Sequence, residues 1–225
     1  MNGPKKQKKK AVLFLNGKYS TRDFPLYQSL CRGKLKIAVD GGVSYFNKSK
    51  SKPDMIIGDF DSSRISPDKL RTKYPKAEIL TYPVEKDKTD IHLAIDICLE
   101  RGVSKIDIVQ PSLGELDHLL GNLMLLTKFK TKPGEKNPVV ARLIGPTYEA
   151  SLLDNRSLRV IDKKGWGLSI IPLSKRIKLS SRGLQYPASE IVVRQGESRS
   201  LRNLVTMESA QVTVEGQAFM IVLKP

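Results

Sequence analysis

Short apolar runs alternate with amphipathic stretches over the first two thirds of the chain, and this alternation restricts the fold more than any other feature of the sequence. Five runs, each bounded by Gly, Pro or Asp, have the length of a strand: 11–15, 35–39, 55–57, 78–80 and 105–109. Runs of this kind are typical of parallel strands that helices cover on both faces. We predict two helices between and after them, over 89–101 and over 115–129.

The pattern changes after about residue 138, where short strand-like segments are separated by turn residues. In one of them, Val212 and Val214 alternate with polar neighbours, as in a half-buried antiparallel strand. We therefore predict an α/β fold with an N-terminal doubly wound, mostly parallel α/β/α domain over 11–146. An all-β, sandwich-like C-terminal domain is expected over 147–225, and a disordered basic leader over 1–10.

The formal net charge of +16 is the most unusual bulk property of the chain. The lysines are scattered through predicted loops without interleaved aromatics, so we expect no specific nucleic acid, although a basic nucleic-acid-binding protein remains the non-enzyme alternative. No apolar run reaches the roughly 18 residues of a membrane span, so we expect no membrane partner. Cys31 and Cys98 lack metal-ligand spacing and indicate free thiols in a reducing compartment, hence a cytoplasmic location.

Carboxylates follow two of the predicted strands directly. Asp40 precedes Gly41 and Gly42, whose bare backbone would let a phosphate approach, although Asp-Gly-Gly is also an ordinary turn. Asp59 and Asp61 stand at i and i+2 after the next strand, so an extended backbone would turn both to one side. Two close like charges repel each other, and a divalent cation makes such a pair favourable.

A third acidic segment surrounds the predicted start of the helix over 89–101. Asp87 or Thr89 stands where an N-cap is wanted and Asp90 lies in the first turn, so capping alone would explain these residue types. The carboxyl ends of parallel strands meet at one edge of a sheet, so we expect Asp40, Asp59, Asp61 and Asp90 to converge there. Mg²⁺ binds few carboxylates and takes its other ligands from water and phosphates, which makes ATP the natural companion of the cluster.

These segments resemble the acidic motifs of the thiamine pyrophosphokinase family in order and spacing: Asp40-Gly41-Gly42, Gly58 to Ser62 and Lys86 to Asp90. Gly114 to His118, followed by Asn122, is similar to the family's Gly-Arg-Leu-Asp-His and its later Asn. Three C-terminal segments also resemble family signatures: Ile170 to Ser174, Gly183 to Pro187 and Gly196 to Asn203.

The resemblance implies a Mg²⁺-dependent transfer of a pyrophosphoryl group from ATP to the hydroxyl of thiamine, giving thiamine diphosphate and AMP. It implies Asp59, Asp61, Asp90 and Asp117 as catalytic residues, with Asp40, Asp59, Asp61 and Asp90 as metal ligands. The implied nucleotide-binding residues are Asp40, Gly41, Gly42, Asp87, Thr89 and Asn122. The implied thiamine-binding residues are Tyr186, Ser200 and Asn203, at the interface of a homodimer.

Two departures from the family pattern keep a second enzyme reading open. Glu115 replaces an Arg beside the expected phosphate site, and Arg202 stands where a Ser is usual. A diphosphokinase for another alcohol, such as a hydroxymethylpterin, would use the same acidic domain with a different acceptor pocket.

Overall fold

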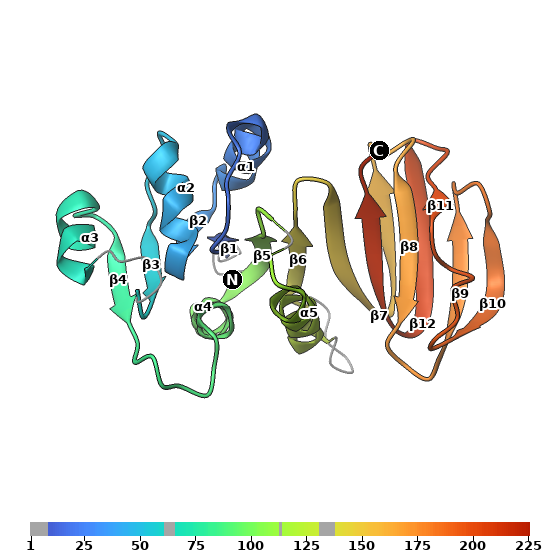
Figure 1. Ribbon diagram of the computed structural model, residues 1–225. Coiled ribbons are helices and arrows are strands. Elements are labelled where there is room, and N and C mark those ends of the chain that lie inside the picture. The colour runs from blue at the N-terminus through green and yellow to red at the C-terminus, as the bar shows by residue number, and fades with distance from the viewer. Residues whose placement is uncertain (1–8, 61–65, 113, 131–137) are drawn as a thin grey trace, which may run out of the picture. The chain divides into compact units, whose positions relative to one another are not determined.

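The computed structural model describes residues 9–60, 66–112, 114–130 and 138–225. Its contacts divide the chain into two compact units: unit 1 is Met1–Leu125 with Val139–Pro146, and unit 2 is Leu126–Pro138 with Thr147–Pro225. The sequence predicts that the whole of 11–146 belongs to the first domain, whereas the contacts assign the segment 126–138 to unit 2. Each unit is described by itself below (Figure 1).

Unit 1 is built on a six-stranded parallel sheet with the order β6-β5-β1-β2-β3-β4. Its strands are β1 (Lys9–Phe14), β2 (Leu35–Val39), β3 (Met55–Gly58), β4 (Glu78–Thr81), β5 (Val103–Val109) and β6 (Val140–Ile144). The chain adds strands outward from β1 to β4 and then returns to the other side of β1 with β5. The strand order therefore reverses between β1 and β5, where doubly wound sheets bind their ligands.

Helices cover both faces of this sheet, as Figure 1 shows. They are α1 (Phe24–Cys31), α2 (Val43–Lys48), α3 (Pro67–Lys73), α4 (Asp90–Glu100) and α5 (Leu116–Leu125). The first three follow the outward strands and pack on one face, whereas α4, which contacts β2, β3 and β5, belongs to the return half. Right-handed crossovers put the two groups on opposite faces. The predicted α/β/α arrangement is thus confirmed.

The core under α1 and α2 is aromatic. Phe14 stacks on Tyr45 with ring centres 4.1 Å apart, and Tyr27 and Phe46 meet these rings edge-on. All four side chains are buried. Rings in such stacked and edge-on pairs bury large apolar areas, so this cluster fixes α1 and α2 against the sheet.

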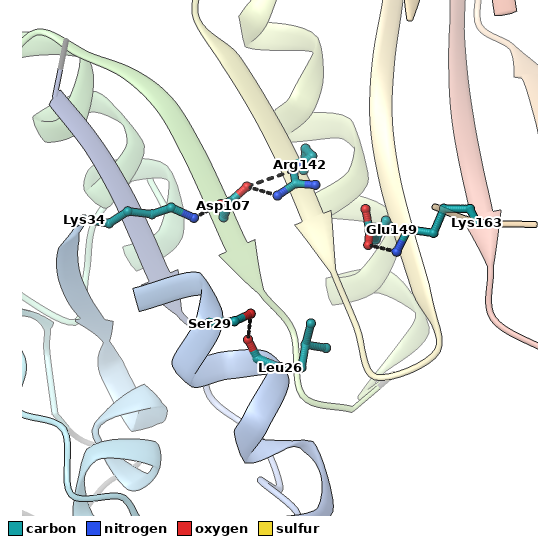
Figure 2. A network of polar contacts seen from close by, with 7 residues as sticks. All are labelled: Leu26, Ser29, Lys34, Asp107, Arg142, Glu149 and Lys163. Atoms are coloured by element: carbon teal, nitrogen blue, oxygen red, sulfur yellow. Dashed lines mark hydrogen bonds and ion pairs between the residues drawn. The ribbon is translucent and has the colours of Figure 1, made fainter. Parts of the chain in front are cut away.

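A charged network also crosses the sheet of unit 1. The carboxylate of Asp107 on β5 is fully buried and forms ion pairs with Lys34 and, at 2.8 Å, with Arg142 on β6 (Figure 2). Burial raises the pKa of a carboxyl, but the two cations outweigh it and lower the pKa of Asp107 below its ordinary value. The group is therefore ionised and held by its partners.

The strand β1 begins two residues earlier than predicted. Lys9 and Lys10 were expected in a disordered leader, yet they pair with Val103 and Lys105 of β5 while their side chains stay exposed. Backbone pairing needs no apolar side chain, so the apolar run marked only the buried part of the strand. The rest of the expected leader, residues 1–8, lies outside the described residues.

Unit 2 is antiparallel and is organised around one long strand. Its strands are β7 (Tyr148–Ile161), β8 (Gly167–Pro172), β9 (Arg176–Arg182), β10 (Ala188–Arg194), β11 (Asn203–Leu204) and β12 (Ser209–Leu223). β12 pairs with β7 on one side, while its first half pairs with β9 and its second half with β8 on the other. β10 extends β9, and β11 extends β8. These antiparallel strands confirm that the C-terminal region is rich in β-structure, as the sequence predicts.

The residues Glu215-Gly216 look like a turn in the sequence but form a bulge within β12. The pairing with β7 shifts between Val214 and Gln217, and Gly216 has a φ of 100°. A glycine adopts this backbone without steric cost and lets the strand bend while both halves stay paired. One strand therefore runs through the bulge from Ser209 to Leu223.

Among the helices that the structure describes, none is long and apolar enough to cross a membrane.

Candidate functional site

A cavity of about 700 Å³ opens at the carboxyl ends of the unit 1 strands, next to the point where the strand order reverses. Four chain segments form it: the loop after β1, the end of β2, the entry to α4, and the stretch from the end of β5 into α5. Its polar lining residues are Asn16, Asp40, Asp87, Thr89, Asp90, His92, Gln110, Ser112, Glu115, Asp117, His118 and Asn122. The location and the lining are those of a ligand site in a doubly wound sheet.

Asp40 lies at the end of β2 with a left-handed backbone, φ 46°, which Asp tolerates better than most residues. It begins a short 3-10 turn, Asp40–Gly42, that leads into α2. Gly41 and Gly42, the other two residues of this turn, are buried and are absent from the cavity lining. A Cβ on Gly41 would lie 2.2 Å from the Asn16 side chain, and one on Gly42 would lie 1.8 Å from the Phe14 carbonyl oxygen. Both glycines serve close backbone packing of this turn against the end of β1.

We expect Gly42→Ala to destabilise the fold by about 2 kcal/mol, because an added methyl group must push the turn away from the rigid backbone of β1. Gly121→Ala in α5 is the control, since its Cβ would meet open space and alanine favours helix. Urea unfolding of both variants measures the two effects. Equal stabilities of the two variants would contradict the packing role of Gly42.

Asp59 follows β3, and the next residue, Phe60, fixes the position of its backbone. Phe60 has a φ of 61°, unusual for a bulky side chain, and its ring is buried in the core beneath the outward helices. Burial of the ring holds this turn, which presents the Asp59 carboxylate at the sheet edge with only 11% of the side chain exposed. Asp61, the second carboxylate of the predicted pair, lies outside the described residues.

Lys86 connects Asp59 to Asp90. Its Nζ donates to Asp59 Oδ2 at 2.6 Å and to the carbonyl oxygen of Pro83 at 3.1 Å, and it lies 3.4 Å from Asp90 Oδ1. Burial disfavours the charged ammonium, yet the hydrogen bond to Asp59 and the charge of Asp90 outweigh it and raise the pKa of Lys86. The two carboxylates are thus already gathered around a cation.

Burial and the charges of the neighbouring acidic residues shift the pKa of Asp90. Burial raises the pKa of Asp90, and the nearby charges of Asp59 and Asp40 raise it further, while Lys86 opposes them. Asp40, Asp59 and Asp90, all among the described residues, do not bring three carboxylate oxygens within 4.8 Å of one another. They lie close enough to interact, with Lys86 between two of them.

Asp87 and Thr89 line the cavity at the entry to α4. Thr89 has the extended backbone of an N-cap, but its side chain makes no capping hydrogen bond. Capping therefore does not account for Thr89, which is an exposed residue of the cavity lining.

The start of α5 supplies a second polar group. Glu115, Asp117 and His118 are exposed, and one ligand-type atom from each lies within 4.8 Å of the others. Asp117 Oδ1 accepts a hydrogen bond from the His118 backbone N–H at 2.7 Å. One turn on, Asn122 donates to Gln110 Oε1 at 3.1 Å, so its amide is oriented by a residue at the end of β5.

Unit 2 has its own cavity, of about 140 Å³, whose lining includes Tyr186, Ser200 and Asn203. Asn203 bridges the loop that carries Tyr186, because it accepts from the Tyr186 N–H at 3.1 Å and donates to its carbonyl oxygen at 2.7 Å. Ser200 donates to the Ile170 carbonyl oxygen at 2.7 Å. The Tyr186 side chain is free to contact a ligand, with the residue 68% exposed.

Sequence reasoning did not single out several residues of the unit 1 cavity. Asn16 and Gly17 follow β1, and Gln110 and Ser112 follow β5, so their place just after an apolar run was the available signal. His92 carries no signal beyond its position in the first turn of α4. Lys86 was part of a quoted motif, but its contact with two carboxylates needed the folded structure.

The donors at the sheet edge suit a hard divalent cation. They are carboxylate oxygens on three neighbouring segments, the ligand type that Mg²⁺ prefers. The side-chain cation already held between Asp59 and Asp90 supports the same conclusion, because it shows that the edge favours positive charge.

Fold and site together define an α/β enzyme with an acidic, cation-holding edge beside a large cavity that many polar residues line. The profile of the family described as "Thiamin pyrophosphokinase, catalytic domain" matches residues 27–136. The thiamine pyrophosphokinase of Bacillus subtilis (strain 168) is 30% identical over 171 residues, which span 75% of this chain and 77% of that protein. The chain belongs to the thiamine pyrophosphokinase family.

Solved structures show the same fold. The thiamine pyrophosphokinase structure from Bacillus subtilis matches with a TM-score of 0.79 and 24% identity, over 96% of this chain and all of that one. The one from Candida albicans matches with a TM-score of 0.76 and 19% identity, over 97% of this chain and 90% of that one.

Proposed function

We propose that this chain transfers a pyrophosphoryl group from ATP to the hydroxyl of thiamine, forming thiamine diphosphate and AMP with Mg²⁺. Family membership supports the reaction. The observation that carries the proposal to this chain is the edge of unit 1, where Asp59 and Asp90 hold a cationic group close to a cavity of nucleotide size. A triphosphate brings four negative charges and needs cations where it meets carboxylates.

In this reaction the thiamine hydroxyl oxygen attacks the β-phosphorus of ATP. The bond between that phosphorus and the oxygen bridging to the α-phosphorus breaks, AMP leaves with the bridging oxygen, and the hydroxyl proton is released. Mg²⁺, when bound, neutralises charge on the phosphates. The chain's task is to hold the reacting groups in line in a site with fixed charges.

We assign the metal-holding role to Asp59, Asp90, Asp40 and, from the sequence, Asp61. Asp87, Thr89 and Asn122 line the same cavity and are assigned to the nucleotide, and Asp117 to ordering the nucleotide or a metal-bound water. Gly41 and Gly42 contribute by fixing the turn that carries Asp40. The Glu115 carboxylate lies on the cavity lining where the family has an Arg, so the phosphates must find their positive partners elsewhere.

Thiamine is assigned to the unit 2 cavity, with Tyr186 stacking on one of its rings and Ser200 and Asn203 shaping the pocket. The exposed tyrosine and its ordered loop support this assignment. We further propose that the enzyme is a homodimer with thiamine bound at the subunit interface and that it is cytoplasmic. Light scattering of the purified protein tests the first point and cell fractionation the second.

We expect Tyr186→Ala to raise the KM for thiamine about tenfold while the KM for ATP stays unchanged, because one aromatic stacking surface is lost. Tyr186→Phe, which retains the ring, should behave almost like the native enzyme. Steady-state kinetics with each substrate varied in turn measure the effect. A thiamine KM unaffected by the alanine substitution would place the acceptor elsewhere.

The proposed reaction is tested by measuring AMP formation from ATP and Mg²⁺ with and without thiamine. Release of AMP that depends on thiamine is expected. A parallel panel of acceptors, including a hydroxymethylpterin, decides the specificity. AMP release with a pterin and none with thiamine would replace the proposed acceptor.

A further inference from the structure

The Lys86 ammonium lies between two carboxylates and a backbone carbonyl oxygen at the acidic edge. Its ammonium group faces Asp59 Oδ2, Asp90 Oδ1 and the Pro83 carbonyl oxygen at 2.6, 3.4 and 3.1 Å. An ammonium has three N–H donors and no acceptor. It donates hydrogen bonds to Asp59 and Pro83, and Asp90 Oδ1 lies within ion-pair distance. The side chain is only 15% exposed, which makes it a built part of the acidic edge.

This arrangement compensates charges that would otherwise repel. The side chains of Asp59 and Asp90 are 11% and 17% exposed, and the Asp40 charge acts on Asp90 as well. Carboxylates this close to one another repel unless a cation lies between them, and Lys86 lies within 2.6 Å of one and 3.4 Å of the other. Without metal, Lys86 supplies that cation from the chain itself.

We propose that Lys86 is an internal counter-ion that competes with divalent cations for Asp59 and Asp90. This inference rests on the proposed function, in which these carboxylates hold Mg²⁺. A divalent ion binding there must displace the ammonium from both carboxylates, because the two cations would repel each other at such distances. The nucleotide-free enzyme therefore holds metal weakly.

The competition links metal binding to the nucleotide. Phosphates that arrive with the cation offer the displaced ammonium new anionic partners, so the combined metal and nucleotide can bind where the metal alone binds poorly. Lys86 would thus prevent the acidic edge from filling with cations in the absence of substrate.

Lys86→Gln tests this competition in the nucleotide-free protein. We expect the Kd for Mn²⁺, measured by titration calorimetry without nucleotide, to fall about tenfold when the competing charge is removed. Lys88→Gln is the matched control, because it removes the same charge two residues away from a lysine that pairs with Asp96 at 2.8 Å. Lys86→Arg keeps the positive charge and should bind Mn²⁺ no more tightly than the native chain.

Thermal unfolding provides a second readout that does not depend on activity. In EDTA, Lys86→Gln should unfold at a lower temperature than the native protein because Asp59 and Asp90 lose their counter-ion, and Mn²⁺ should restore more stability to it than to Lys88→Gln.

Unchanged Mn²⁺ affinity in Lys86→Gln, in a protein that binds Mn²⁺ natively, would overturn the competition and leave the proposed function intact. An equal tightening in Lys86→Arg or Lys88→Gln would also overturn it, because the effect would then not follow the charge at this position. If neither the native chain nor any variant bound Mn²⁺, with or without ATP, the metal site of the proposed function would fail together with this inference.

Discussion

Asp59→Asn is expected to lower kcat/KM for thiamine-dependent AMP formation by about a thousandfold. The substitution keeps the size of the side chain and removes the charge that faces Lys86 at 2.6 Å and that is proposed to hold Mg²⁺. In the proposed reaction, catalysis consists of aligning phosphates and neutralising their charge, so the loss should appear in the rate while the fold survives. From the sequence, Asp61→Asn should act in the same direction.

The control for this prediction lies at the opposite end of the same strand. Asp54 immediately precedes β3, accepts a hydrogen bond from the Lys36 N–H at 2.8 Å and is exposed. Asp54→Asn should retain nearly full activity. Far-UV circular dichroism of both variants checks that folding is equal, and a near-normal rate for Asp59→Asn would remove that carboxylate from the active site.

The parallel sheet was predictable because burial on both faces leaves a direct trace in the sequence. The apolar runs of β1, β2 and β5 belong to strands that lie between two layers of helices, and most of their buried side chains are apolar, with the ion-paired Asp107 of β5 as an exception. The helix predicted over 89–101 is observed as Asp90–Glu100 because its apolar stripe has the helical period. In unit 2 the same argument is weaker, because β7 and β9 continue their pairing through polar residues and so lack a continuous apolar run.

The location of the candidate site followed from topology, whereas its contacts did not. Carboxylates that follow parallel strands must lie at one sheet edge, and Asp40, Asp59 and Asp90 do. The distance from Lys86 to each acid depends on how the β4–α4 loop folds back, and no local pattern encodes that. The two glycines after Asp40 show a different limit. A sequence does not distinguish a glycine that lets a phosphate approach from one that lets two backbone segments pack closely, and here the second role is observed.

Asp107→Asn should destabilise the chain by about 3 kcal/mol at neutral pH. The residue is fully buried, and its loss of charge leaves Lys34 and Arg142 without the carboxylate that both contact (Figure 2). Asp68→Asn is the surface comparison, since Asp68 pairs with Arg71 at 2.7 Å with its side chain 89% exposed and should cost less than 1 kcal/mol. Urea unfolding at pH 7 compares the two.

The pH dependence of the stability difference between the native protein and Asp107→Asn distinguishes loss of the charge from loss of packing. The folded pKa of Asp107 is lowered, so the unfolded chain binds a proton at a higher pH than the folded chain does. The stability from the ion pairs is therefore fully present above the unfolded pKa of about 3.9 and is lost as the pH falls through the folded value. The stability gap between native protein and Asp107→Asn should narrow as pH drops below about 4. A gap that stayed constant into acid would mean that Asp107 contributes through packing, and that the partly buried charges of Lys34 and Arg142 are compensated without it.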